Sequence, residues 1–128
     1  MKYEINEIMD MLDWNNSIHI QEKGCELAKR IKCINVFLQP NDCYYNKNVW
    51  ENCAKILSQR TDEELSYYLT ELFNWLKDMT WPGASIIYDR LKRYKKDEIF
   101  DTYYNLILKK AKLLQDDIWY NELYSLKG

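Results

Sequence analysis

The chain has 128 residues, of which 47% are hydrophobic and 30% charged, and its formal net charge is −2. This length fits one domain covering residues 1–128, and the composition is that of a folded rather than a disordered chain. The near-neutral charge argues against a nucleic-acid partner. The chain has only three glycines and two prolines, too few for the many tight turns of an all-β fold.

The first residues, MKYEINEIMDMLDW, alternate charged and apolar side chains and contain no apolar segment typical of a signal peptide. No apolar run approaches the ~18 residues that a membrane span requires. We therefore expect a cytoplasmic protein that has no membrane partner. The four cysteines, Cys25, Cys33, Cys43 and Cys53, have spacings that fit no common zinc or redox motif, so we expect free thiols and no metal.

Helical spacing of apolar residues predicts a first helix over about 2–12 and a second over about 19–32. Residues 33–38, CINVFL, are apolar and fit either a short helix or a strand. The polar, turn-rich residues 39–48 predict a loop.

The pattern is stronger in the second half, where helices are predicted over about 48–58, 62–77, 84–94 and 97–115. Thr61 and Glu64 form a capping-box pattern at the start of the second of these. Ile118, Trp119 and Leu123 predict a short terminal helix. For the helix over 97–115, the predicted apolar face consists of Ile99, Tyr103, Leu106, Ile107, Ala111 and Leu114.

A weak internal repeat appears when the chain is shifted by 34 residues. The shift places Leu57 on Leu91, Leu72 on Leu106, and the acidic start at Glu63 on that at Asp97. Two amphipathic helices cannot cover both of their faces alone, so repeated pairs are expected to stack. We therefore predict an all-α fold of about six helices in antiparallel pairs.

The segment DMTWPGA lies between two predicted helices and has a structural explanation. Pro82 is tolerated in the first turn of a helix, where its missing N–H would have no partner. Gly83 allows a neighbouring helix to approach closely, and the ring of Trp81 is placed to cover the junction. We interpret Trp81, Pro82 and Gly83 as a structural corner rather than a ligand site.

No catalytic constellation is evident in the sequence. His19 is the single histidine, and no distinctive nucleophile lies near it. Acidic pairs occur at 63–64, 97–98 and 116–117, and two of them fall at predicted helix starts, where negative charge interacts favourably with the helix dipole. We expect no catalytic residue and no cofactor, although a small carboxylate-dependent hydrolase or DNA-repair enzyme remains an alternative.

A different set of residues escapes the predicted core and suits recognition of a basic protein. Acidic and tyrosine side chains together favour such a partner through charge complementarity and aromatic anchoring. These residues fall into three groups. One follows a stripe of the helix over 62–77, another lies on the helix over 97–115, and the last lies near the C-terminus. The candidate partner-binding residues are Glu64, Tyr67, Glu71, Asn74, Asp78, Asp101, Asn105, Tyr120 and Tyr124.

Residues 73–91, FNWLKDMTWPGASIIYDRL, carry a W-L-x-D-x-x-W-P-x-A signature and follow VWENCAKILSQRTDEELSYYLTEL over 49–72. This region resembles a family of small bacterial HEAT-like helical-repeat domains of unassigned function. Residues 21–40 resemble it more loosely, and the tail after residue 95 only poorly. The resemblance implies a right-handed HEAT-like helical stack.

Members of that family resemble immunity proteins of polymorphic and contact-dependent toxin systems. The resemblance therefore implies a cytoplasmic immunity protein that occludes a cognate toxin, such as a nuclease with a basic active site, at fixed stoichiometry. It supplies no functional residue that can be carried over. The alternative is a non-catalytic helical scaffold that assembles other proteins, and in both cases the partner is a protein rather than a nucleic acid, membrane or small-molecule cofactor.

Overall fold

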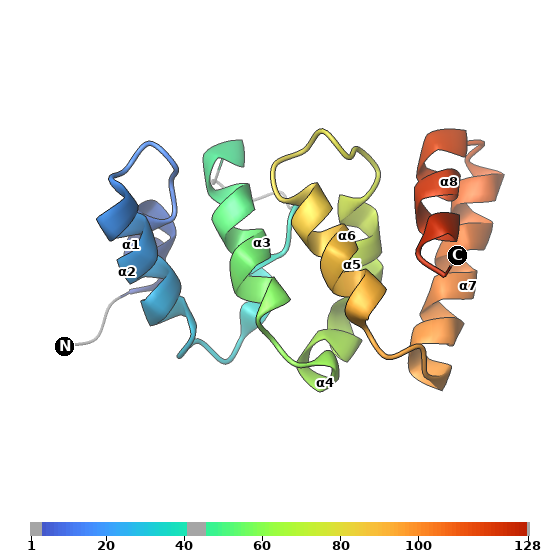
Figure 1. Ribbon diagram of the computed structural model, residues 1–128, viewed down its shortest axis with the longest axis horizontal. Coiled ribbons are helices and arrows are strands. Elements are labelled where there is room, and N and C mark those ends of the chain that lie inside the picture. The colour runs from blue at the N-terminus through green and yellow to red at the C-terminus, as the bar shows by residue number, and fades with distance from the viewer. Residues whose placement is uncertain (1–3, 41–45, 128) are drawn as a thin grey trace.

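The computed structural model describes residues 4–40 and 46–127, and every regular element in these ranges is helical. The all-α prediction is therefore confirmed for the described part of the chain. Figure 1 shows two rows of helices along the long axis of the molecule. The nearer row contains α2 (Ile18–Ala28), α3 (Trp50–Ser58), α6 (Ala84–Arg93) and α8 (Asp117–Ser125), and the farther row contains α1 (Ile5–Met11), α5 (Leu69–Trp75) and α7 (Glu98–Leu113).

At one end of the stack, α1 packs against α2 through a close approach at Gly24. A Cβ at this position would lie 2.8 Å from the Cβ of Met11, so a larger residue would separate the helices. The predicted second helix is shorter than expected, because α2 ends at Ala28. The guanidinium of Arg60 donates to the carbonyls of Ala28 and Ile31, at 2.8 Å each, and so satisfies this helix end from 29 or more residues away.

The ambiguous segment over 33–38 forms a short 3₁₀ helix, η1 (Ile34–Phe37), which packs against α3. The predicted loop over 39–48 is only partly described, because residues 41–45, including Cys43, lie outside the described ranges. Its last residues enter a second 3₁₀ turn, η2 (Lys47–Val49), which leads directly into α3. Helical backbone therefore begins at Lys47, three residues before Trp50, the first residue of α3.

The prediction of one helix over 62–77 is wrong, because the segment is divided into three elements. These are α4 (Asp62–Leu65), the 3₁₀ turn η3 (Ser66–Tyr68) and α5. The Ser66 hydroxyl donates to the Glu63 carbonyl at 2.7 Å, a local hydrogen bond that competes with regular helix geometry. The capping box is confirmed, since the Glu64 amide donates to the Thr61 hydroxyl at 3.1 Å.

The turn between α5 and α6 places Trp75, Trp81 and Trp50 together. The indole of Trp75 is fully buried and donates to the Pro82 carbonyl at 3.0 Å. Trp81 is only half-buried, and its ring meets that of Trp50 edge-on at 5.6 Å. Gly83 has a positive φ of 83° and precedes the first residue of α6.

The buried face of α7 differs from the predicted one. Phe100, Tyr104, Ile107 and Ala111 are buried, whereas Ile99, Tyr103, Leu106 and Leu114 are exposed. Both sets recur at helical spacing, so the sequence alone does not separate them. The choice is tertiary, because the ring of Phe73 on α5 contacts those of Phe100 and Tyr104 at 5.6 and 6.1 Å.

Arg90, a buried residue of α6, connects α6 to the start of α4. Its guanidinium donates to the Asp62 carboxylate at 2.5 Å and to the Arg60 carbonyl at 2.9 Å. The Asp62 carboxylate also accepts from the Lys95 amide at 3.0 Å. Burial opposes ionisation of Asp62, but these hydrogen bonds and the charge of Arg90 outweigh it and lower the pKa of Asp62.

Replacing Asp62 with asparagine should lower the free energy of unfolding by about 1–2 kcal/mol near neutral pH, because a nearly buried charged donor loses its ionic acceptor. A carboxylate whose pKa is lowered in the folded state stabilises the protein above its ordinary pKa and loses that contribution as pH falls. The difference between D62N and the unsubstituted chain should therefore shrink between about pH 5 and pH 2. Urea unfolding at both ends of this pH range measures the difference in free energy of unfolding. The control is Glu51→Gln, which changes an exposed carboxylate. A difference that stays constant with pH would contradict the role of ionised Asp62.

None of the helices over 4–40 and 46–127 combines the length and the apolar character needed to cross a membrane.

Candidate protein-binding surface

The helices α7 and α8 at one end of the molecule form the candidate surface (Figure 1). Both begin with an aspartate cap: Asp97 accepts from the Phe100 amide at 2.9 Å, and Asp116 accepts from the Trp119 amide at 3.1 Å. Between them, Gln115 adopts a positive φ of 57°, and the Asp116 amide donates back to the Ala111 carbonyl at 3.0 Å. This tight helix end turns the chain back, so that α8 packs against α7.

Tyr104 joins the two helices at the base of this surface. Its hydroxyl donates to the carbonyls of Leu123 and Tyr124, at 2.7 and 3.2 Å. Burial, and to a lesser degree the nearby Tyr120, Tyr124 and Tyr88, raise the pKa of Tyr104 to about 12. The phenol therefore remains a neutral donor at physiological pH and fixes the C-terminal end of α8 against α7.

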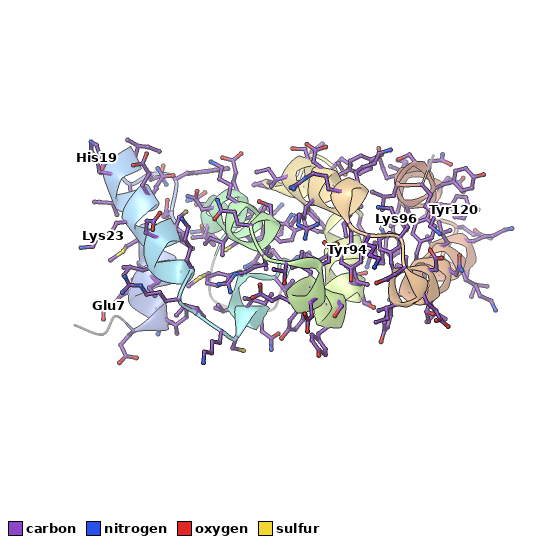
Figure 2. All side chains as sticks on the ribbon, turned by 60° about the horizontal axis from the view of Figure 1, so that its bottom comes forward. Glu7, His19, Lys23, Tyr94, Lys96 and Tyr120 are labelled. Carbon is purple, nitrogen blue, oxygen red and sulfur yellow. The ribbon has the colours of Figure 1, made fainter. Side chains whose placement is uncertain are left out.

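A groove of about 330 Å³ lies between α7 and the end of α8. Tyr124 is 63% exposed at its rim and stacks on Tyr120, with ring centroids 6.1 Å apart. Figure 2 shows Tyr120 at this end of the molecule, far from His19 at the other. We call this feature the tyrosine groove and define it by Tyr104, Asn105, Leu108, Tyr124 and Lys127.

The charges at the tyrosine groove are already partly matched within the chain. Lys127 forms an ion pair with Asp101, and its ammonium lies 5.1 Å from the centre of the Tyr104 ring. Both charged side chains keep substantial exposure. The groove therefore offers aromatic area, an amide from Asn105 and an exchangeable ion pair, which suits a partly polar protein surface better than a lipid.

The structure brings four of the predicted partner-binding residues together. Asn105 and Tyr124 line the tyrosine groove, Tyr120 stacks on Tyr124, and Asp101 pairs with the lining residue Lys127. The remaining five lie elsewhere, on the segment from α4 to the turn after α5. They do not form the predicted single-helix stripe, because the 3₁₀ turn η3 changes the residue spacing within it.

Of these five residues, two form structural hydrogen bonds within the chain and a third is half-buried. Glu64 completes the capping box and pairs with Arg60 at 3.1 Å. The carboxylate of Asp78 accepts from both the hydroxyl and the amide of Thr80, which lower its pKa. Asn74 is half-buried. Tyr67, which is 79% exposed, and Glu71 are exposed, as is Glu64.

The sequence interpretation missed Tyr104, Leu108 and Lys127 as lining residues. The spacing of Phe100, Tyr104, Ile107 and Ala111 was a usable signal for Tyr104, because it marks a second apolar stripe on the same helix. No sequence signal identifies Lys127, which reaches the groove only because α8 folds back along α7.

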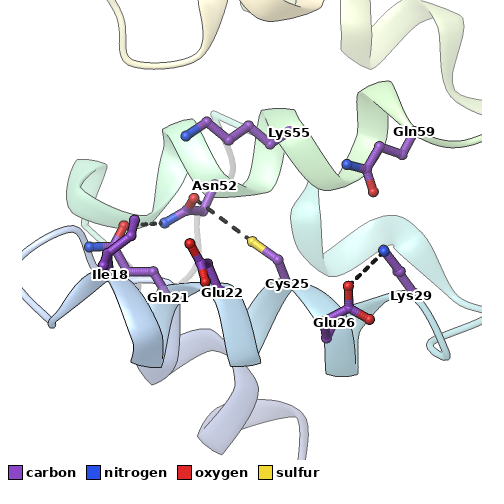
Figure 3. A pocket seen from close by; sticks show the side chains of 9 residues that line it. All are labelled: Ile18, Gln21, Glu22, Cys25, Glu26, Lys29, Asn52, Lys55 and Gln59. Atoms are coloured by element: carbon purple, nitrogen blue, oxygen red, sulfur yellow. Dashed lines mark hydrogen bonds and ion pairs between the residues drawn. The ribbon is translucent and has the colours of Figure 1, made fainter.

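A second and larger groove of about 390 Å³ lies between α2 and α3 (Figure 3). At its base, the buried amide of Asn52 donates to the Leu12 carbonyl at 2.7 Å and to Gln21 at 3.0 Å. The thiol of Cys25 donates to the Asn52 oxygen at 3.8 Å, and burial raises the pKa of this thiol. Asn52, Gln21 and Cys25 thus help to hold α1, α2 and α3 together.

Among the described residues, the other side chains that could bind a metal or act as nucleophiles lie apart from one another. His19 is exposed in the first turn of α2, and in the ranges that the structure describes no three His, Cys, Asp or Glu side chains gather as a metal site. Cys53 is buried as a small apolar group, Cys25 is half-buried and Cys33 is exposed, all as free thiols. Burial raises the pKa of Cys53 to about 12.

A family model described as a domain of unknown function, DUF5071, matches residues 46–126, which is more than half of the chain. The match begins just before α3 and extends beyond residue 95, where the sequence resemblance was poor, to cover both helices of the candidate surface. It does not include α1 and α2. No curated protein and no solved structure matches the chain.

Proposed function

The chain belongs to the DUF5071 family, and from this premise we propose that it is a protein-binding module that neutralises a cognate toxin as an immunity protein. The observation that supports a binding role is the tyrosine groove, where the exposed Tyr124, stacked on the half-buried Tyr120, meets an amide and an ion pair at the end of α8. Exposed tyrosines commonly dominate binding energy at protein interfaces. The toxin assignment itself rests on the sequence resemblance to immunity proteins.

The proposed mechanism is stoichiometric occlusion without turnover. Helices stacked in two rows hold the groove in place, so binding requires little ordering of the inhibitor. In this proposal the rows are a HEAT-like right-handed stack, and the toxin contacts the surface of its last helices. The exposed Glu71, on α5, and its neighbours add negative charge that attracts a basic nuclease active site and raises the association rate.

Replacing Tyr124 with alanine should weaken toxin binding at least tenfold, because it removes the exposed aromatic anchor of the groove. Folding should be unaffected, since the side chain is 63% exposed and Tyr104 bonds to the backbone of Tyr124 rather than to its ring. The partner to test is the C-terminal domain of a toxin encoded next to this gene. Affinity is measured with purified proteins, and protection is measured as growth of cells that express both.

Two further variants separate the possible faces. Trp14→Ala removes a comparably exposed aromatic ring at the far end of the molecule and should leave affinity unchanged. Glu71→Lys should slow association, more strongly at low salt, if the segment around α5 steers the toxin. Loss of binding in Glu71→Lys but not in Tyr124→Ala would place the interface on α5, and failure of the unsubstituted chain to inhibit the toxin would refute the immunity function.

Inhibition of the toxin should also become complete at a fixed molar ratio of this chain to the toxin. A titration of toxin activity that reaches completion at substoichiometric amounts of this chain would indicate an enzyme instead. A chain that binds the toxin without inhibiting it would favour the non-catalytic scaffold.

A further inference from the structure

An exposed apolar stripe runs along one flank of α7, separate from the tyrosine groove. Ile99 is 50% exposed, Leu106 60% and Leu113 77%, and Tyr103 lies between the first two. Spacings of four, three and seven residues place these side chains on one face of an α-helix. We call Ile99, Tyr103, Leu106 and Leu113 the α7 stripe.

The α7 stripe and the tyrosine groove lie on opposite flanks of the same helix. At 3.6 residues per turn, the buried residues Phe100, Tyr104 and Ile107 fall between the stripe on one side and Asp101 and Leu108 on the other. A partner seated on the stripe therefore does not need the groove residues. The stripe is not part of the function proposed above.

Comparison with the preceding helices shows that apolar residues at these positions are normally covered. The residues 34 positions before Ile99, Tyr103 and Leu106 are Leu65, Leu69 and Leu72, and all three are buried at 1% exposure or less. On α7 the same positions remain apolar, but nothing in the described chain covers them to that extent. At this point of the fold, therefore, α7 has an apolar face of the kind that another helix buries.

The α7 stripe is close to symmetrical about its own centre. Ile99 and Leu113 each lie seven residues from Leu106, and Tyr103 and Lys110 lie on opposite sides of it, at three and four residues. When a helix of this pattern meets a second copy running antiparallel, Leu106 meets itself and Ile99 faces the partner subunit's Leu113. Tyr103 then faces the partner subunit's Lys110, whose ammonium can lie over the ring.

The charges of α7 favour the same arrangement. Its first turn carries the exposed Glu98 and also Asp101, which is already paired with Lys127 on the groove flank, and its last turn carries Lys110 and Lys112. Among the ion pairs of the described residues none involves Lys110 or Lys112. An antiparallel pair brings each basic end near the acidic end of the other copy, whereas a parallel pair would bring like charges together.

From this apolar pattern, its symmetry and its charge order, we propose that the protein forms a two-fold symmetric dimer in which the α7 stripes of two copies pack antiparallel. Such an interface is isologous, so only Leu106 meets its own counterpart, and the contact between Ile99 and the partner subunit's Leu113 occurs twice. Lys110 within the seam limits the affinity and fixes the register, as single polar residues do in coiled coils.

Sedimentation equilibrium of the full chain over a concentration series tests the proposal. We expect a reversible dimer, and Leu106→Lys should raise its dissociation constant at least tenfold because it places two like charges on the symmetry axis. The matched control is Ile20→Lys, which makes the same kind of change at an exposed apolar residue of α2 and should leave the dimer intact. Circular dichroism melting checks that both variants remain folded.

Disulfide cross-linking then tests the direction of the helices. Under mild oxidation, Leu106→Cys should form covalent dimers well above the level of the unsubstituted chain, which controls for the natural cysteines. Leu113→Cys should not, because two such residues in an antiparallel pair lie about 21 Å apart along the axis, far beyond disulfide reach. A monomer at all concentrations up to about 1 mM, a dimer insensitive to Leu106→Lys, or equal cross-linking of both variants would each overturn the proposal.

Discussion

We expect replacement of Trp119 by alanine to lower the free energy of unfolding by about 3–5 kcal/mol, the largest effect of any single truncation discussed in this chain. Trp119 has no exposed surface, and its indole N–H donates to the Phe73 carbonyl at 3.0 Å. The ammonium of Lys77 lies 4.8 Å from the centre of the ring. Loss of the Trp119 side chain leaves a cavity between α8 and α5, and it leaves the buried Phe73 carbonyl without its hydrogen-bond donor.

Two companion variants separate these contributions. Trp119→Phe keeps most of the apolar contact but not the hydrogen bond, and should cost about 1–3 kcal/mol. Trp14→Ala removes a ring that is 44% exposed and should change stability by no more than about 0.5 kcal/mol. Urea unfolding followed by circular dichroism measures all three, and a cost below about 1 kcal/mol for Trp119→Ala would contradict this packing of α8 on α5.

Replacement of Gly83 by alanine should destabilise the protein by about 2–4 kcal/mol, although it adds only one methyl group. The positive φ of 83° is unfavourable for any residue with a Cβ. In addition, the new Cβ would lie 2.7 Å from the Cβ of Ala54 and 3.0 Å from the Trp50 carbonyl, so α6 would have to move away from α3. Backbone strain and overpacking therefore act in the same direction.

The neighbouring variant Ser85→Ala is the control, because it adds no atoms and alters an exposed side chain two residues further along α6. It should melt within a few degrees of the unsubstituted protein, while Gly83→Ala melts well below both. Equal melting temperatures for the two variants would mean that α3 and α6 do not approach as closely at this turn as the structure shows.

Local signals in the sequence predicted local features well. The capping box of Thr61 and Glu64 forms as predicted, because both partners lie within one helical turn and need no distant contact. Trp119 and Leu123 are buried on one face of α8 while Tyr124 is exposed, as that short segment indicated, but Ile118, which was predicted together with them, is 73% exposed. The all-helical character of the described chain likewise follows from repeated 3.6-residue periodicity.

Features that depend on more than one segment were decided only in the folded molecule. Helical periodicity on α7 marks two apolar stripes, and contact with Phe73, a residue of another helix, determines which one is buried. The end of α2 at Ala28 likewise involves a group whose partner the sequence pattern does not reveal, the guanidinium of Arg60.

The candidate site shows the same division between the two kinds of information. The sequence by itself determined that Asp101, Asn105, Tyr120 and Tyr124 fall outside the predicted apolar faces, because side-chain chemistry and period are local properties. Only the tertiary structure placed these residues around one groove with Tyr104 and Lys127, and left the five residues from Glu64 to Asp78 apart from it. The physical reason is that a groove exists only between helices, and the left-handed residue Gln115, which turns α8 back onto α7, sets where those helices meet.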